Sequence, residues 1–531
     1  MMLSGTPYTI AGVLPARFQF PFSGLDVWLT RPADSPAFAP KSRELSPILS
    51  IFARLRPDVT LEQADAEMAV IQRQYAMSHP AMLDAKPKSP VHLMPLKERL
   101  VANVRSILWM LFGAVSFVLL IACANVAGLL LARANARSRE FAIRAALGAS
   151  RGRLVRQLLA ESVLLSVAGG LLGIWFAILS LRGVPHIAAF DLPRANEIHP
   201  DWLVLLFAAS LSAITGILFG LAPALNFSRP DLIASLRSRG EAANSGIRWR
   251  VRSGATVRSA LVIGQVTLSI VLLIGAAILI ESMVRLEGEN PGFNPEGLLT
   301  MRLSLPLSRY DTDQKRNGFF DALTARVESL PGVRGAAAAM TLPMSGFAGS
   351  PVQDASKPPL KLNERPIATI LIVSPDYFRT LQISIRRGRT FSRRDRQETQ
   401  RVAVIDEGLA RQLWPEYPGG TNPIGQRLFI GGTNPTPAEI VGIVNNVHQN
   451  VENTGWPGSV YQPFAQNPLP SGMLAIRTDA NSARLAPAVR AQVQSLDREQ
   501  PLSNVRTMDD LIEAQLGQRR LLLELLTSFA C

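Results

Sequence analysis

The sequence predicts a multi-pass α-helical membrane protein with four transmembrane helices and mixed α+β domains on the extracytoplasmic side. Three observations support this prediction. Four long stretches contain no charged residue, two of the segments that join them are strongly basic, and the two remaining regions alternate strand-like and helix-like patterns. The hydrocarbon core of a bilayer is about 30 Å thick and requires roughly 20 apolar residues of helix, so each uncharged stretch is long enough to cross it.

The uncharged stretches are residues 106–132, 162–181, 202–228 and 259–280. The alternative is a buried helical hairpin in a large soluble protein, but buried helices rarely lack charge over about 20 residues, and four such stretches occur here. The composition agrees, because a charged fraction of 18% beside a hydrophobic fraction of 47% suits a chain that lies partly in a membrane.

The basic segments predict which side of the membrane each region occupies. Residues 133–156 hold seven arginines against Glu140, and residues 229–258 hold seven arginines against two acidic residues. The intervening loop, residues 182–201, is not basic. Because basic loops remain in the cytoplasm, we expect residues 1–105 and the region after residue 280 to be extracytoplasmic. The net charge of +14 then reflects topology and attraction to membrane lipid, and we expect no nucleic-acid partner.

The first 105 residues resemble part of a mixed α/β domain. Thr60 is an expected N-cap for a helix from Leu61 to about Met77, because apolar residues then recur at helical spacing. Short apolar runs predict strands at residues 8–13, 26–30, 51–55 and 91–94.

A second soluble region of mixed α+β pattern follows the fourth uncharged stretch. Strands are expected at residues 298–305, 333–341, 368–373, 402–405, 439–444 and 473–478. Helices are expected at residues 314–330, 407–413 and 482–496.

The two soluble regions share an internal repeat. YTIAGV near the start matches AEIVGIV at residues 438–444, and VHLMPLKERLVANVRS matches VRTMDDLIEAQLGQRR near the end. The offset between matching residues drifts from about 430 to about 414, which indicates loops of different length. On this interpretation residues 1–105 correspond to the last part of the second domain, and the final residues correspond to the start of the first membrane helix. We therefore expect a gene fragment that begins within a domain and stops within a helix.

The segment between the first two uncharged stretches carries a family motif. It contains Arg139, Glu140, Ile143, Arg144, Ala146, Gly148 and Ala149, followed by Glu161 and Ser162. This pattern resembles the MacB/FtsX-like ABC transporter permeases. Residues 222–237 resemble the end of the permease unit, and the region from residue 259 onward resembles the first helix of a second copy that enters a periplasmic core domain. The order is similar to that of the duplicated orphan permeases of acidobacteria, truncated at both ends.

The resemblance implies a division of the chain into six parts. These are the C-terminal part of a first MacB-type periplasmic core domain (1–105), an FtsX-like permease domain with three transmembrane helices (106–228), a basic cytoplasmic linker (229–258), a fourth transmembrane helix (259–280), a second MacB-like periplasmic core domain (281–518) and the start of a truncated transmembrane helix (519–531). Four complete helices are present where a duplicated permease would have eight.

The resemblance also implies a function. The chain is expected to be the permease subunit of an ABC-type transporter, which transmits motion from a separate ATPase to the extracytoplasmic domains for export of an unknown substrate. The residues that would dock on the ATPase are Arg139, Glu140, Ile143, Arg144, Gly148 and Ala149. From the residues alone, an interfacial helix resting on anionic lipid explains this segment equally well.

The sequence contains no sign of catalysis, a cofactor or a metal site. None of the seven lysines follows a glycine, so a phosphate-binding Gly-x4-Gly-Lys loop is excluded. The five histidines are scattered and form no spaced ligand pair, and no Gly-x-Ser-x-Gly elbow occurs. Two cysteines, Cys123 and Cys531, do not provide a disulfide framework. We expect a protein that is not an enzyme.

Small residues in the uncharged stretches predict close helix packing. Gly169 and Gly173 share one helix face, as do Gly216 and Gly220. Packing within the bundle and contact with a second copy in a homodimer are the two interpretations. Asn125 and Gln265 are the notable uncharged polar side chains, for which a hydrogen bond between helices is expected.

Three interpretations of the function of the whole protein are consistent with the sequence. The first is a permease of the bacterial inner membrane that exports a substrate together with a periplasmic adaptor or an outer-membrane channel. The second is a membrane regulator of FtsX type that acts on a cell-wall hydrolase or a sensor. The third is a non-functional gene fragment.

Overall fold

The computed structural model describes two compact units of the chain, which are treated separately here. The core unit comprises residues 1–20, 24–100 and 286–516, and the membrane unit comprises residues 21–23, 101–285 and 517–531. Within these units the structure describes residues 2–3, 6–15, 18, 20, 26–29, 51–80, 91–137, 140, 143–144, 151–183, 201–227, 248–432, 435–450, 456–479 and 482–530.

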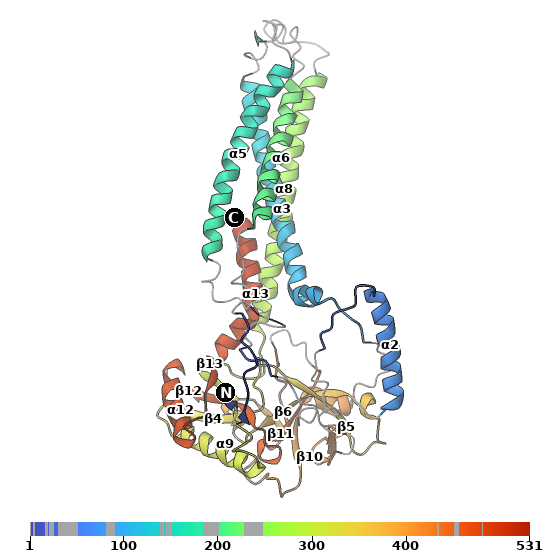
Figure 1. The fold of residues 1–531 in the computed structure, drawn as a ribbon, viewed down its shortest axis with the longest axis vertical. Helices are drawn as coiled ribbons and strands as arrows, with labels where there is room; N and C mark the ends of the chain where they lie inside the picture. The colour runs from blue at the N-terminus through green and yellow to red at the C-terminus, as the bar shows by residue number, and fades with distance from the viewer. Residues whose placement is uncertain are drawn as a thin grey trace. The chain divides into compact units, whose positions relative to one another are not determined.

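Four long helices form most of the membrane unit (Figure 1). They are α3 (Leu96–Ala136), α5 (Arg151–Gly183), α6 (Trp202–Phe227) and α8 (Arg248–Gly288). Segments long and apolar enough to cross a membrane lie at Leu108–Leu130, Leu159–Ser180 and Ser259–Leu286. In α6 the apolar stretch with described side chains is Trp202–Ile217, within a helix of 26 residues. Each helix contains one of the uncharged stretches, so the predicted helical membrane fold is confirmed.

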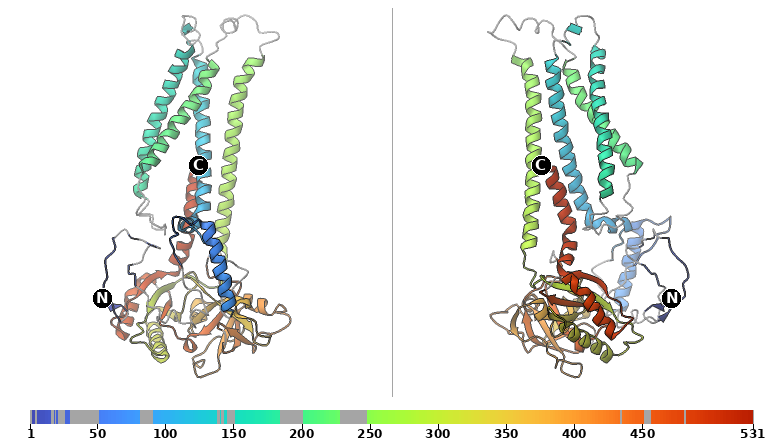
Figure 2. Two further views of the ribbon diagram at one scale, coloured as in Figure 1. Left: turned by 45° about the vertical axis from the view of Figure 1, so that its right-hand side comes forward. Right: turned by 90° about the vertical axis from the view of Figure 1, so that its left-hand side faces the viewer.

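The helices of the membrane unit run alternately up and down (Figures 1 and 2). The C-terminal ends of α3 and α6 therefore lie at the same end of the bundle as the N-terminal ends of α5 and α8. The side chains on the outside of the bundle are large and apolar, for example Leu164, Trp175 and Phe176. Apolar side chains facing outward are costly in water and favourable in hydrocarbon, so the surface of the bundle suits a lipid environment.

The helix predicted after Thr60 is confirmed as α2 (Leu61–Ser78). The side chain of Thr60 accepts a hydrogen bond from the backbone N–H of Gln63 at 3.2 Å, and the side chain of Gln63 accepts one from the N–H of Thr60 at 3.0 Å. This reciprocal pair satisfies backbone donors that the first helical turn leaves unpaired, and it explains why the helix begins at Leu61.

The strands predicted in the first 105 residues are not formed. Residues 8–13, 26–29, 51–55 and 91–94 have no strand assignment, and β1 (Met2–Leu3) and β2 (Thr6–Pro7) pair only with each other. Several apolar side chains of these runs are exposed, with Val13 at 92%. The matching strands of the second domain pair with strands that come earlier in that domain. A strand is stable only when neighbouring strands pair with it, so an apolar alternating pattern alone was not sufficient here.

The remainder of the core unit, here called the core domain, is built around an eleven-stranded sheet. Its strands are β3 (Leu298–Ser304), β4 (Val333–Ala339), β5 (Ala348–Asp354), β6 (Ile367–Val373), β7 (Ile385–Gly388), β8 (Val402–Asp406), β9 (Arg427–Ile430), β10 (Ala438–Val444), β11 (Ser459–Pro463), β12 (Ser471–Thr478) and β13 (Ser503–Thr507). Its helices are α9 (Asp313–Glu328), α10 (Tyr377–Leu381), α11 (Glu407–Leu413), α12 (Ser482–Leu496) and α13 (Met508–Ala530), with short 3-10 turns at Leu362–Glu364 and Phe464–Gln466.

The sheet has two parts. Strands β4, β12, β3 and β13 form a largely antiparallel part, and helices α9 and α12 pack on it. Strands β6, β5, β9, β10, β8 and β11 form a closed ring, because β11 pairs with both β8 and β6. A single residue pair, Ala339 with Val373, joins β4 to β6. The sequence predicted β3, β4, β6, β8, β10 and β12 but missed β5, β7, β9, β11 and β13.

Alternation of buried and exposed side chains explains how helices pack on one part of the sheet. In β3 the side chains of Met301 and Leu303 are fully buried, whereas their neighbours Arg302 and Ser304 are exposed. On α9 the buried residues Phe319, Phe320, Leu323 and Val327 recur at helical spacing and pack in the same cluster. Periods of two and of about 3.6 residues thus place one apolar face of the strand against one apolar face of the helix.

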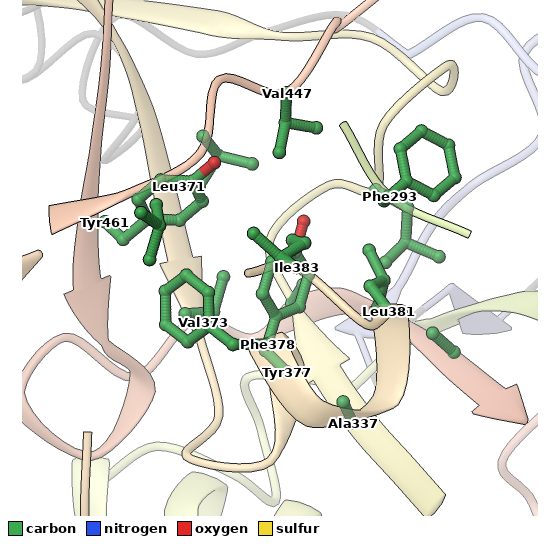
Figure 3. Close-up of a cluster of buried hydrophobic side chains, with 14 of the residues drawn as sticks. Phe293, Ala337, Leu371, Val373, Tyr377, Phe378, Leu381, Ile383, Val447 and Tyr461 are labelled. Carbon is green, nitrogen blue, oxygen red and sulfur yellow. The ribbon is translucent and has the colours of Figure 1, made fainter. Parts of the chain in front are cut away.

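A second cluster surrounds the short helix α10, as Figure 3 shows. Tyr377, Phe378 and Leu381 of α10 are buried with Tyr461 of β11, and the rings of Phe378 and Tyr461 lie 5.1 Å apart. Burial raises the pKa of both tyrosine hydroxyls because the charged phenolate is disfavoured in an apolar environment. The helix is therefore anchored between the two parts of the sheet.

Candidate functional site

The loop between α3 and α5 contains the predicted ATPase-docking residues. The structure describes three of them, Glu140, Ile143 and Arg144, all in helical conformation. Arg139, Gly148 and Ala149 lie outside the described residues. The loop follows the C-terminal end of α3, so its described side chains lie at the end of the bundle that the charge pattern assigns to the cytoplasm.

Two polar links attach this loop to α5. Arg144 forms an ion pair with Glu140 at 2.6 Å and donates a hydrogen bond to the side chain of Gln157 on α5 at 3.1 Å. Arg137, at the end of α3, lies 3.6 Å from Glu161 of α5. Exposed pairs of this kind contribute only about 0.5 kcal/mol each, so they orient the loop more than they stabilise the fold. Movement of the loop would therefore act directly on α5.

The described part of the loop combines an exposed apolar side chain with charged neighbours. The side chain of Ile143 is 61% exposed, and it lies between the charged residues Glu140 and Arg144 along the chain. A single exposed apolar side chain is common on protein surfaces, so this feature alone does not identify a contact with a partner. The sequence motif did not identify Gln157, whose role depends on the position of α5.

Helices α5 and α6 pack closely through small residues. A Cβ atom on Gly170 would lie 2.8 Å from Oγ of Ser212, and one on Gly216 would lie 2.6 Å from Cβ of Ser166. Ser212 also donates a hydrogen bond to the carbonyl of Ser166 at 2.9 Å. These contacts leave no room for a larger side chain, so the two helices meet nearly backbone to backbone.

The predicted glycine pairs are only partly supported. Gly216 lies in the α5–α6 contact, but a Cβ on Gly169 or Gly173 would meet no described atom within 4 Å. Gly170, one position along, faces α6 instead, because a shift of one residue turns a helix by about 100°. The surroundings of Gly220 lie outside the described residues.

The expected hydrogen bonds of Asn125 and Gln265 are also absent among the described residues. Neither side chain has a hydrogen-bond partner there. The hydroxyl of Ser212 on α6, which donates to the backbone carbonyl of Ser166 on α5, supplies a polar contact between helices instead. A cavity of about 200 Å³ adjoins this contact and is lined by Ala122, Cys123, Val126, Leu130, Ser162, Leu165, Ser166, Thr215 and Gly216.

A buried arginine fixes the point where the chain enters the core domain. The guanidinium of Arg477 on β12 donates hydrogen bonds to the carbonyls of Thr380 at 2.6 Å, Glu296 at 2.6 Å and Asn294 at 2.7 Å. Burial lowers its pKa from the ordinary value because the charged form is desolvated. Residues 294 and 296 lie six and eight residues after the end of α8, so Arg477 attaches the segment after a membrane helix to α10 and to β12.

The exit from the core domain is attached to the same region. Met508, at the start of α13, is fully buried in the cluster around α10. Gln515 of α13 donates a hydrogen bond to the carbonyl of Met344 at 2.7 Å. The sequence analysis missed these attachments. An arginine within the otherwise apolar run MLAIRT was the available signal, since a charge in a buried strand requires partners.

Among the described residues there is no group of three or more histidine, cysteine, aspartate or glutamate side chains arranged to hold a metal ion.

Two parts of the chain match known protein families. Residues 259–496 match the family described as MacB-like periplasmic core domain, and residues 112–232 match the FtsX-like permease C-terminal family. Part of the chain is similar to the uncharacterized ABC transporter permease YknZ of Bacillus subtilis, with 32% identity over 138 residues, which are 26% of this chain and 33% of that protein.

The names of two other relatives include both an ATP-binding part and a permease. The macrolide export ATP-binding/permease protein MacB of Syntrophobacter fumaroxidans is 33% identical over 137 residues, 26% of this chain and 18% of that protein. The pyoverdine export ATP-binding/permease protein PvdT of Pseudomonas aeruginosa is 33% identical over 143 residues, 26% of this chain and 20% of that protein. The matches thus span a third or less of the length of these relatives.

Among solved structures, the periplasmic region of MacB from Actinobacillus actinomycetemcomitans aligns with 42% of this chain and 94% of its own, at 13% identity and a TM-score of 0.29. The two family matches include the α3–α5 loop, the helices around it and most of the core domain. Residues 112–232 are therefore an FtsX-like permease region and residues 259–496 a MacB-like periplasmic core domain, in a multi-pass membrane protein with an extracytoplasmic α/β domain that is similar in part to ABC transporter permeases.

Proposed function

We propose that this chain is the permease subunit of an ABC-type transporter, in which a separate ATPase drives movement of the extracytoplasmic domains for export of a substrate. The observation that supports the proposal most directly is the link from the α3–α5 loop to α5 through Arg144 and Gln157. This loop lies within the FtsX-like match, and its exposed Ile143 and charged neighbours form a surface on which an ATPase would dock.

The proposed path of motion starts at that loop. Displacement of Arg144 would move α5 through Gln157, and the backbone contact at Gly216 would carry α6 with it. On the other side of the membrane, α8 continues into the segment held by Arg477, so that a shift of this helix would act on α10 and β12. Rigid helices and buried hydrogen bonds suit such transmission because they deform little under load.

The proposal places both large soluble regions on the extracytoplasmic side of a bacterial inner membrane. The basic segments 133–156 and 229–258 connect the C-terminal ends of α3 and α6 to the N-terminal ends of α5 and α8, which lie at one end of the bundle, and the positive-inside rule assigns this end to the cytoplasm. In this arrangement the core domain would meet substrate, a periplasmic adaptor or an outer-membrane channel, and no substrate need pass through the helices.

In this proposal the ATPase is a separate polypeptide that docks on the chain. The test is co-purification from membranes in a mild detergent, with the tagged chain as bait. Charge reversal of Glu140 or Arg144 should reduce the recovered ATPase at least about fivefold, as expected when a contact with a charge complementary to the partner becomes repulsive. Arg153→Glu is the matched control, since Arg153 is an exposed arginine on α5 near the same end of the bundle.

Unchanged recovery of the ATPase with both variants would show that the loop is not the docking surface. The same experiment separates export from regulation. A periplasmic adaptor or outer-membrane channel among the recovered proteins supports export, whereas a cell-wall hydrolase or sensor kinase would replace the export proposal by the regulator.

A further inference from the structure

The core domain carries a strongly basic segment that membrane topology does not explain. Residues 379–401 contain eight arginines against Asp395 and Glu398. They lie within the core domain, more than 90 residues after the end of α8, so the rule for loops next to a membrane helix does not apply to them. A charge excess of this kind on a folded domain points to an anionic partner.

This segment borders a groove of about 550 Å³ between α10, the start of β7 and the loop after β7. Its floor is apolar and consists of Phe378, Ile383 and Phe391, which belong to the buried cluster around α10. Polar and charged side chains form its walls, which include Asp376, Arg379, Gln382, Ser384, Thr390, Ser392 and Arg393. An apolar floor with polar walls is suited to an elongated ligand that has both kinds of group.

The arginines near the groove differ in how far they are already paired. Arg389 makes two hydrogen bonds to the carboxylate of Asp395, at 2.8 and 2.9 Å. Arg379 pairs with Asp376 at 2.9 Å and Glu328 at 3.0 Å. Arg393 is exposed and forms no ion pair within 4 Å with any residue that the structure describes, although it acts on Asp321 from a longer distance. Among these three arginines, Arg393 therefore has the charge that is most available to a ligand.

Ile385, which lines the groove, begins a strand that has an open edge. Strand β7 pairs with β10 along one side, with Gly388 opposite Gly442 and Ile385 opposite Val444. Its other side pairs with no strand in the described part of the chain, and all four residues are exposed, with Ile385 at 49%. An open edge presents unpaired backbone N–H and C=O groups, which another strand can satisfy.

We propose that the β7 edge and the adjoining groove bind an acidic, extended peptide segment of a partner protein, which adds to β7 as a further strand. The unpaired backbone groups favour a peptide over a small anion or a lipid headgroup, neither of which can form a strand ladder. The positive charge of this segment favours a negatively charged peptide. Arg386 lies 3.8 Å from Glu407 and Arg387 lies over the ring of Tyr417, but both side chains are exposed. A second copy of β7 would therefore bring like charges together, whereas an acidic strand would meet opposite ones.

The geometry also defines the pattern of the peptide. Side chains of a strand point alternately to opposite faces, so acidic residues on the face of Arg386 would alternate with apolar residues on the face of Ile385 and the groove floor. An alternating peptide of glutamate and valine has this pattern. The inference depends on the core domain alone and holds whichever protein docks on the α3–α5 loop.

The experiment measures fluorescence polarisation of labelled (Glu-Val)4 with the detergent-solubilised full chain. We expect saturable binding, and we expect binding at least about tenfold weaker for (Lys-Val)4 because its charges are repelled. A (Glu-Val)4 peptide N-methylated at every second residue should also bind at least about tenfold more weakly, because it cannot complete the strand ladder.

Two substitutions separate the groove from general attraction to a basic protein. Arg393→Glu should weaken binding of (Glu-Val)4 at least about tenfold. Arg394→Glu should change it by less than about twofold, because Arg394 is equally exposed and makes the same change of net charge but does not line the groove. Both positions are on the surface, so the folded state should be retained, as a melting curve would verify.

Equal weakening by the two substitutions would overturn the proposal in favour of non-specific attraction. Undiminished binding of the N-methylated peptide would exclude strand addition. Absence of peptide binding, together with binding of dihexanoyl phosphatidylglycerol to the original chain but not to the Arg393→Glu variant, would identify a headgroup site and overturn the peptide proposal.

Discussion

Gly216 of α6 lies so close to Ser166 of α5 that a Cβ on the glycine would be 2.6 Å from the Cβ of the serine. Real side chains do not approach so closely, so only glycine fits at this point without a shift of the helices. The hydrogen bond from Ser212 to the carbonyl of Ser166 holds the same two helices together. The α5–α6 pair is therefore specified by shape as well as by hydrophobicity.

The first prediction follows from this contact. Gly216→Ala should destabilise the membrane unit by about 1–3 kcal/mol, because overpacking forces α5 and α6 apart. The measurement is the melting temperature of the solubilised chain. Ser166→Gly in the same chain should restore most of the loss by removing the opposing atoms. Gly169→Ala is the control and should have little effect, since that position faces open space in the described structure. An equal effect at Gly169 would contradict the assigned contact.

The second prediction concerns the buried guanidinium of Arg477. Arg477→Met should reduce the free energy of unfolding of the core domain by roughly 3 kcal/mol or more, because three backbone carbonyls would lose charged donors. Denaturant unfolding of the solubilised chain, followed by tryptophan fluorescence, would measure the loss. Arg490→Met, at an exposed position on α12, should stay within about 0.5 kcal/mol of the original chain. Similar losses for the two variants would show that Arg477 does not hold the entry segment.

The third prediction concerns the pH dependence of stability. Burial raises the pKa of Asp406 to about 6, although hydrogen bonds from Ser459 and Leu409 oppose this effect. Between about pH 4 and pH 6 the native chain therefore binds more protons at this residue than the unfolded chain. The contribution of Asp406 to stability should fall as the pH rises through this window and level off above it, by an amount on the order of 3 kcal/mol.

Asp406→Asn tests this directly. Asparagine retains an oxygen that can accept the hydrogen bond from the N–H of Leu409, now 2.8 Å long, at the start of α11. The variant should gain stability relative to the original chain as the pH rises from 4 to 7, measured by unfolding at unit steps of pH. A difference that is independent of pH would show that Asp406 does not titrate in this range.

The fourth prediction separates the internal role of Glu140 and Arg144 from their proposed role in docking. The charge swap Glu140→Arg with Arg144→Glu keeps an ion pair one helical turn apart, so the melting temperature should change by less than about 2 °C. The swap reverses the charges that a partner would meet, so recovery of the ATPase should be as low as with charge reversal of Glu140 or Arg144 alone. Full recovery of the ATPase would mean that only the internal pair matters.

The sequence by itself determined the membrane helices and the start of α2. Lack of charge over about 20 residues and the distribution of arginine are properties of a single segment, and they do not depend on neighbours. The capping box at Thr60 and Gln63 is equally local, since both partners belong to one helical turn. The motif around Glu140 and Arg144 also identified the family, because it is a continuous stretch of chain.

Only the tertiary structure decided which strands form and which glycine makes a contact. The apolar runs at residues 8–13 and 51–55 have the pattern of strands, but a strand is stable only when a neighbour satisfies its backbone groups. In the same way, Gly169 and Gly170 are equivalent by composition, and the position of α6 alone selects Gly170. Arg477 and the open edge of β7 acquire their roles from residues far away in the chain, because hydrogen bonds and strand pairing join positions that the order of residues leaves apart.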